Sequence, residues 1–103
     1  MKIQTARSGS RLVIKLCGEM DEYSAAQVRT ACDDIIDRNK TAGSIVIDLA
    51  DVAFMDSTGI GFLIGRYKKA GKMGIKLAVQ SPNFAADKVL SLAGIYTLIP
   101  KVN

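Results

Sequence analysis

The junction between a buried strand and a glycine-rich helix, within residues 44–68, most constrains the fold of this 103-residue chain. Residues 44–49 form a nearly continuous apolar run, which favours a strand covered on both faces of a sheet. Asp56, Ser57 and Thr58 then offer adjacent side chains that accept hydrogen bonds from the free N–H groups at the start of a helix. The pattern therefore predicts a serine hydroxyl at a strand-to-helix junction.

The helix that follows has an unusual pattern on its two sides. At about 100° per residue, one side carries Ile60, Leu63, Ile64, Tyr67 and Ala70, and the other carries Gly61, Phe62, Gly65, Arg66 and Lys69. Each glycine, including Gly59, costs a helix about 1 kcal/mol relative to alanine. The residues alone leave two interpretations: this second side docks a partner, or another helix of the same domain covers it and glycine permits close approach.

Three motifs resemble those of a known family. Residues 54–61 read Phe-Met-Asp-Ser-Thr-Gly-Ile-Gly and residues 65–68 read Gly-Arg-Tyr-Lys. Together they resemble the signature of the bacterial anti-sigma factor antagonists, which are single STAS domains. Residues 16–21 resemble the strand-end motif L-x-G-E-[LM]-D of that family, and residues 91–96 resemble its late S-G-[LI]-[FY] turn. The likeness is colinear and is greatest to the sporulation-type antagonist.

The remaining pattern predicts one α/β domain, STAS-like, with a mixed sheet of about five strands and three or more helices. A helix is expected up to about Asn39, with Ser24 and Gln27 as a capping box. A strand at 75–79 should pair in parallel with the central strand through a right-handed crossover. Ser81 and Pro82 are expected to open a third helix, and a last short strand is expected at 97–99.

Residues 1–103 are thus expected to be one STAS domain. Members of the family generally end with one more helix, whereas this chain stops at Asn103. A trimmed C-terminus and a naturally short variant both account for this.

Composition excludes several classes of function. No stretch suits a membrane span or a signal peptide, so a cytoplasmic protein is expected. The net charge of +4 is scattered and aromatic residues make up only 6% of the chain, so no nucleic-acid partner is expected. The short basic cluster 66–72 is interpreted as the solvated end of a helix. Cys17 and Cys32 are interpreted as reduced, mostly buried thiols. Without histidine, His-based metal sites and Ser-His catalysis are excluded.

The resemblance implies a switch and not an enzyme. It implies that Ser57 is phosphorylated by an anti-sigma factor that is also a serine kinase. The unphosphorylated antagonist binds that kinase and frees the sigma factor, and a serine phosphatase resets the cycle. The kinase supplies nucleotide and metal, so no cofactor of the chain's own is expected. Asp21 matches an acidic residue near the phosphosite, and Thr58 is the rival acceptor.

A phosphoryl group on Ser57 adds roughly −1.5 to −2 charges, which a helix N-terminus tolerates. The signal would then be local, because the added charge repels a docked partner. The candidate partner-binding residues around it are Asp21, Asp56, Thr58, Gly59, Gly61, Phe62 and Gly65.

Other interpretations of the same residues stay open. Ser57 and Asp56 suit simple helix capping, and Asp21 suits turn chemistry or capping. The Asp56-Ser57-Thr58 junction with its glycines also suits an anion or nucleotide site of a ligand sensor or hydrolase. The spacing is not that of a P-loop, and Lys68 lies too far along the helix to reach such a site. A structural module of larger, stressosome-type assemblies is the third alternative.

Overall fold

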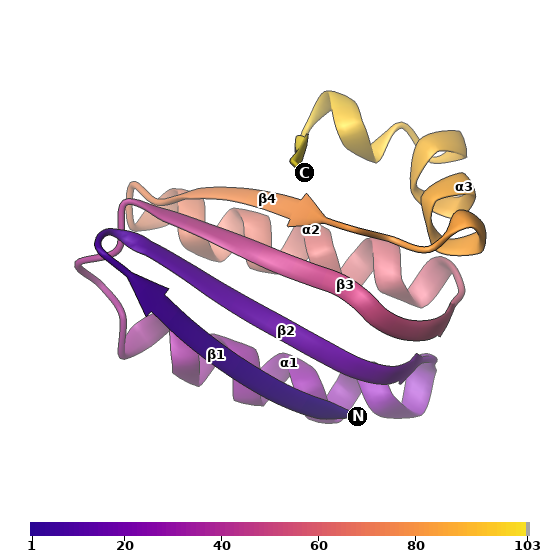
Figure 1. Ribbon diagram of the computed structural model, residues 1–103, viewed down its shortest axis with the longest axis horizontal. Helices are drawn as coiled ribbons and strands as arrows, with labels where there is room; N and C mark the ends of the chain where they lie inside the picture. Colours follow the sequence, from indigo (N-terminus) through magenta and orange to yellow (C-terminus); the bar gives the residue numbers. More distant parts are fainter. Residues whose placement is uncertain (103) are drawn as a thin grey trace.

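A mixed sheet with the strand order β1-β2-β3-β4-β5 forms the frame of the computed structural model, which describes residues 1–102 (Figure 1). Strand β1 is antiparallel to β2, and the other neighbouring pairs are parallel. Within the described residues the elements are β1 (Lys2–Ser8), β2 (Arg11–Met20), α1 (Glu22–Asp37), β3 (Ser44–Met55), α2 (Ser57–Lys72), β4 (Lys76–Gln80), α3 (Phe84–Leu92), a 3-10 turn (Ile95–Thr97) and β5 (Lys101–Val102).

Helices α1 and α2 lie side by side against one face of the sheet, behind the strands in Figure 1. Because side chains alternate along a strand, one set from each strand forms the core beneath these helices. The core side chains of the three central strands are Leu12, Ile14, Leu16, Ile45, Ile47, Leu49, Leu77 and Val79, all at most 3% exposed. The predicted parallel unit of β3, α2 and β4 is confirmed, as is the α/β class with its mixed sheet.

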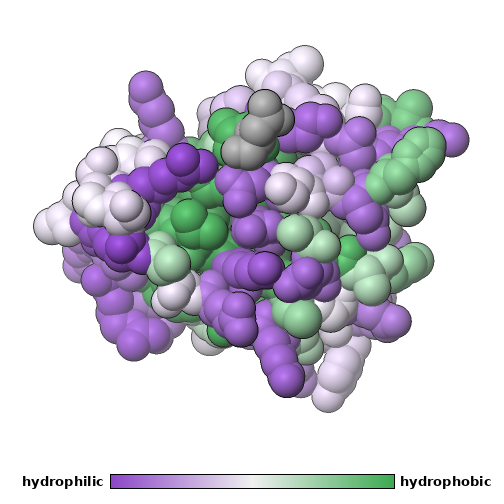
Figure 2. Space-filling view, in the orientation of Figure 1, coloured by the Kyte–Doolittle hydropathy of each residue, from purple (hydrophilic) through white to green (hydrophobic). Residues whose placement is uncertain are grey.

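The opposite face of the sheet is left uncovered by α1 and α2. Val13, Val46 and Ala78 are register partners on this face. Figure 2 looks onto it and shows apolar surface left of the middle, surrounded by polar side chains. Helix α3 lies at the far end of the strands, at the right of Figure 1.

Two predicted helix starts are wrong. Asp21, and not Ser24, is the N-cap of α1, because its carboxylate accepts a hydrogen bond from the Ser24 N–H at 2.9 Å. Asn83, and not Ser81, is the N-cap of α3, where its side-chain oxygen accepts from the Ala86 N–H at 2.8 Å. The Asn83 amide also donates to the Val52 carbonyl at 3.1 Å, which ties α3 to β3.

The predicted strand at 97–99 is also wrong. Gly94 adopts a left-handed conformation, with φ of 73°, and a 3-10 turn follows it. Ile95 and Ile99 are both buried, four residues apart, and the Ile99 N–H donates to the Ile95 carbonyl at 2.8 Å. This spacing is helical and does not alternate, so pairing with β4 is delayed to Lys101–Val102.

The central strand is longer than predicted, since β3 runs on from 49 to Met55. Within residues 1–102, no helix has the length and apolar character to cross a bilayer.

Candidate functional site

The N-terminus of α2 lies where two neighbouring parallel strands end. Met20 of β2 is the register partner of Met55 of β3, and the Asp56 N–H donates to the Met20 carbonyl at 3.4 Å. Asp21 and Asp56 each follow one of these strands directly, so they lie at the same end of the sheet. Each aspartate caps the helix after it.

Ser57 is the first residue of α2 and its side chain is exposed. The cap of this helix is Asp56, whose carboxylate accepts from the Thr58 N–H at 2.8 Å. The interpretation of Ser57 as the capping residue is therefore wrong, whereas the capping role of Asp56 is confirmed. No side-chain hydrogen bond found among residues 1–102 involves the Ser57 hydroxyl, which leaves it open to a reacting partner.

Two carboxylates lie near Ser57. The Ser24 N–H holds the pKa of the Asp21 carboxyl below its ordinary value of 3.8, because that hydrogen bond favours the ionised form. Asp56 adds a second carboxylate directly beside Ser57. A phosphoryl group at Ser57 would therefore join two existing negative charges.

The interpretation that another helix of the same domain covers this side of α2 is confirmed for Phe62, whose side chain is only 4% exposed where α1 packs on α2. The buried residues of α2 are Gly59, Phe62, Leu63, Arg66 and Ala70. Of the five residues predicted to share the apolar side, Leu63 and Ala70 are in the core, whereas Ile60, Ile64 and Tyr67 are only partly buried against it. Helix α2 packs on α1 as well as on the sheet, so it is covered on two sides.

The three glycines of α2 have different surroundings. A Cβ atom at Gly59 would lie 2.5 Å from Cγ of Met55, so this glycine permits the close approach of α2 to the end of β3. A Cβ atom at Gly61 or Gly65 would have nothing within 4 Å. The interpretation that glycine makes room for another helix is therefore wrong for Gly61 and Gly65, since neither is required by contacts within residues 1–102.

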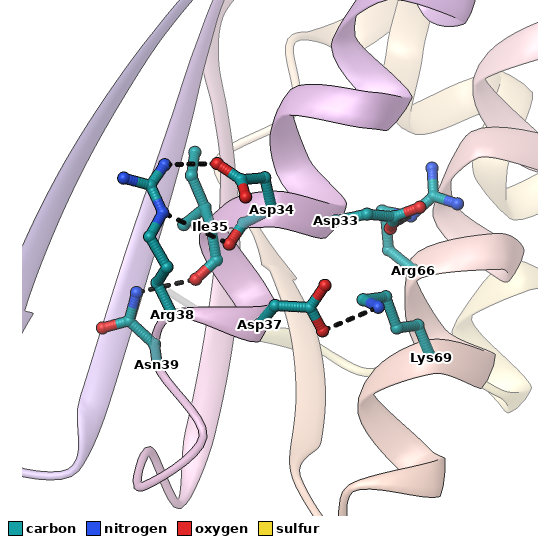
Figure 3. A network of polar contacts seen from close by, with 8 residues as sticks. All are labelled: Asp33, Asp34, Ile35, Asp37, Arg38, Asn39, Arg66 and Lys69. Atoms are coloured by element: carbon teal, nitrogen blue, oxygen red, sulfur yellow. Dashed lines mark hydrogen bonds and ion pairs between the residues drawn. The ribbon is translucent and has the colours of Figure 1, made fainter.

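Two ion pairs connect α1 and α2, as Figure 3 shows. Nε of Arg66 lies 2.7 Å from Oδ1 of Asp33, and Nζ of Lys69 lies 2.9 Å from Oδ1 of Asp37. Arg66 is only 5% exposed, so the expectation of a fully solvated basic cluster is wrong at this position. Its guanidinium also lies 5.1 Å from the centre of the Phe62 ring.

A groove of about 370 Å³ runs between α1 and α2 and begins beside Ser57. Its lining residues are Ala25, Arg29, Thr58, Gly61, Phe62, Gly65 and Arg66. Four of the predicted partner-binding residues, Thr58, Gly61, Phe62 and Gly65, thus meet at one concave surface. A cavity of about 640 Å³ lies at the other end of α2, against β4 and residues 98–100, away from Ser57.

Three exposed aromatic side chains surround this end of the sheet and were not predicted as site residues. Tyr23 is 74% exposed in the first turn of α1, Phe54 is 50% exposed near the end of β3, and Phe84 is 78% exposed at the start of α3. Phe54 lies inside the motif at 54–61, and Tyr23 lies two residues after Asp21. Each of the three lies within two residues of a helix cap, and this position in the sequence indicated an exposed side chain, because helix starts are often at the surface.

The sequence and the fold are similar to those of known proteins. The STAS domain family matches residues 2–103. The anti-sigma F factor antagonist of Paenibacillus polymyxa is 31% identical over 100 residues, which are 97% of this chain and 85% of that protein. The anti-sigma-B factor antagonist of Bacillus subtilis (strain 168) is 24% identical over 99 residues, 96% of this chain and 88% of that protein.

The solved structures of the anti-sigma factor antagonist SpoIIAA share the fold. Its unphosphorylated form superposes with a TM-score of 0.79 at 22% identity, covering 99% of this chain and 89% of that chain. Its phosphorylated form superposes with a TM-score of 0.69 at 22% identity, covering 99% of this chain and 92% of that chain.

Proposed function

This chain belongs to the STAS domain family as an anti-sigma factor antagonist, and on that basis we propose that it is a partner switch controlled at Ser57. Its unphosphorylated form binds an anti-sigma factor that is also a serine kinase, and the sigma factor is released. The kinase transfers a phosphoryl group to Ser57, which ends the binding. A serine phosphatase restores the binding form, and the exchange is between cytosolic proteins.

The observation that carries this proposal is the exposed Ser57 hydroxyl beside a helix cap made by a different residue. Because Asp56 caps α2, phosphorylation removes no hydrogen bond that holds the helix. The added charge of roughly −1.5 to −2 is also favourable at a helix N-terminus. The fold should therefore be the same in both forms, and only the local charge changes.

That change is large for a docked partner. The phosphoryl group adds about as much negative charge as the Asp21 and Asp56 carboxylates together. A partner surface that is acidic or desolvated there would be repelled. SpoIIAA, which shares the fold, has been solved in phosphorylated and unphosphorylated forms.

The proposed docking surface has two parts. One part is the groove lined by Thr58, Gly61 and Gly65, and these three residues contact the partner directly. The other is the set of exposed aromatic side chains at this end of the sheet, Tyr23 and Phe84 above all, since aromatic side chains anchor many interfaces. Gly59 is buried beneath Met55, so packing explains it without a partner.

The experiment that tests the proposal is phosphorylation of the purified protein by its candidate kinases. The protein is incubated with Mg-ATP and the anti-sigma factor kinases of its own organism, of both the sigma F and the sigma B class, because relatives of both classes are known. Mass spectrometry should find one phosphoryl group, at Ser57, and Ser57→Ala should abolish it. Phosphorylation at Thr58 would support the same switching mechanism with Thr58, and not Ser57, as the acceptor.

Binding is then measured with matched variants. Ser57→Asp should unfold at the same urea concentration as the natural protein but lose the complex with the kinase. Ser8→Asp, an exposed serine at the opposite end of the sheet, should bind normally. An active kinase that neither modifies nor binds the protein would refute the proposal.

A further inference from the structure

We infer that the groove between α1 and α2 binds a carboxylate side chain of the anti-sigma factor, held by Arg29 and Arg66. The inference rests on the proposed function, because it names the chemistry by which that partner is recognised. It arises from a buried charge that the chain itself satisfies only in part.

Arg66 lines the groove and is 95% buried, yet part of its hydrogen-bonding capacity is unused. Its Nη1 is buried without a partner among residues 1–102. Its Nε is 2.7 Å from Oδ1 of Asp33, which is its ion-pair partner. The Asp33 carboxylate and the Phe62 ring therefore leave the Nη1 donors of the guanidinium unmatched. Buried charged donors without acceptors are unfavourable, so an acceptor from outside is expected.

Arg29 brings a second cation to the same groove. It lies on α1, its side chain is exposed, and it takes part in none of the ion pairs found within residues 1–102. Arg29 and Arg66 therefore both line one cavity, and Asp33 is the ion-pair partner of Arg66. An anion between the two guanidinium groups would relieve their mutual repulsion. Guanidinium groups match the two oxygens of a carboxylate in geometry and charge.

Gly61 and Gly65 give the approaching side chain its room. Both line the groove, and a Cβ atom at either would have nothing within 4 Å. Packing within the chain therefore does not explain glycine at these two positions, where alanine would favour the helix. A partner segment that lies close to α2 does explain it, because any side chain here would occupy the groove.

The same arrangement connects the groove to the switch. Thr58 lines the groove and follows Ser57 directly, and Gly61 lies one helical turn further on. A phosphoryl group on Ser57 would thus stand beside the entrance through which a carboxylate must pass. Two like charges at this distance repel each other, so phosphorylation and carboxylate binding should exclude one another.

The test is a comparison of affinities for the anti-sigma factor kinase, measured by calorimetry with the unphosphorylated full chain. Arg29→Glu should raise Kd about tenfold or more, since it reverses the charge that meets the carboxylate. Arg38→Glu is the matched control, because Arg38 is an exposed arginine of the same region that pairs with Asp34 outside the groove. Its Kd should change by less than about twofold. Gly65→Ala should also weaken binding while the protein stays folded.

A second measurement identifies the ligand. Acidic residues of the kinase are replaced one at a time by arginine, and one such variant should regain affinity for Arg29→Glu but not for the natural protein. Titration with acetate alone, followed by NMR at the Gly65 amide, should show the same site at far lower affinity. If phosphate shifts this amide and no kinase variant compensates, the groove takes a free anion and the inference is overturned.

These measurements distinguish failure of the groove inference from failure of the proposed function. If the natural protein binds the kinase and Arg29→Glu binds equally well, the groove inference fails and the proposed function stands. If the natural protein does not bind any candidate kinase, the proposed function fails and the inference fails with it.

Discussion

Three alanine substitutions in α2 should change stability in opposite directions, although they share one helix and one chemistry. The substitutions are Gly59→Ala, Gly61→Ala and Gly65→Ala. Alanine is favoured over glycine in a helix interior by about 1 kcal/mol. At Gly61 and Gly65 the new methyl group meets nothing within 4 Å. These two variants should each gain about 1 kcal/mol, which raises the melting temperature of a domain of this size by roughly 4–8 °C.

At Gly59 the same methyl group would lie 2.5 Å from Cγ and 2.7 Å from Sδ of Met55. Met55 is 5% exposed, so it has little free space into which to rotate. Overpacking of a core by one methyl group costs about 1–3 kcal/mol, which outweighs or cancels the gain in helix propensity. Gly59→Ala should therefore be less stable than Gly61→Ala by about 1–3 kcal/mol.

The assay is urea unfolding followed by circular dichroism, with the free energy of unfolding extrapolated to water. The double variant Gly59→Ala/Met55→Ala provides the control, because removing Met55 should convert the effect of Gly59→Ala into a gain. Equal stability of Gly59→Ala and Gly61→Ala would refute the packing argument. A loss of stability for Gly61→Ala would show instead that the groove is not open.

Three further predictions concern buried or paired side chains. Phe62→Ala should lower the free energy of unfolding by about 3–5 kcal/mol, because the ring is buried; an unchanged urea midpoint with weaker kinase binding would show that the ring contacts the partner and not the core. Burial raises the pKa of the Cys32 thiol to about 11, so a thiol reagent at about pH 8 should modify half-buried Cys17 first and Cys32 only on unfolding; equally fast reaction of both would contradict this. Hydrogen bonds donated by Tyr96, which has the larger effect, and by Lys101 lower the pKa of the Asp87 carboxyl below 3.8. The ionised carboxylate therefore stabilises the fold fully above pH 3.8, and this stabilisation is lost as the pH falls through the lower pKa of the folded state. Asp87→Asn should therefore be less stable than the natural protein at pH 7, and the difference in stability should narrow as the pH falls below 3.8; a difference independent of pH would argue against the ionised pair.

Much of the fold follows from patterns within short stretches of sequence. The alternation at 12–16 and the apolar run at 44–49 identified two central strands. The length of the connection between β3 and β4 identified their parallel pairing. Ser57 was placed correctly at the start of α2, because consecutive side chains that accept hydrogen bonds favour the N-terminus of a helix. These features depend on neighbours along the chain, and such neighbours are visible in the sequence.

The helix caps show where local patterns stop being sufficient. Asp21 and Ser24 both suit an N-cap, as do Ser81 and Asn83. The choice of Asn83 is favoured by its second hydrogen bond, to Val52 some thirty residues earlier. That bond exists only once β3 and α3 are packed together.

By itself, the sequence determined the class of the fold and the position of Ser57 at the start of a helix. Only the tertiary structure decided which sides of α2 are covered. A periodic pattern shows one apolar stripe, but α2 packs against the sheet and against α1 in different directions. For that reason Phe62 and Arg66 are buried, and Gly61 and Gly65 border a groove. The direction from which a second helix approaches depends on contacts between residues far apart in the chain, and no local pattern encodes it.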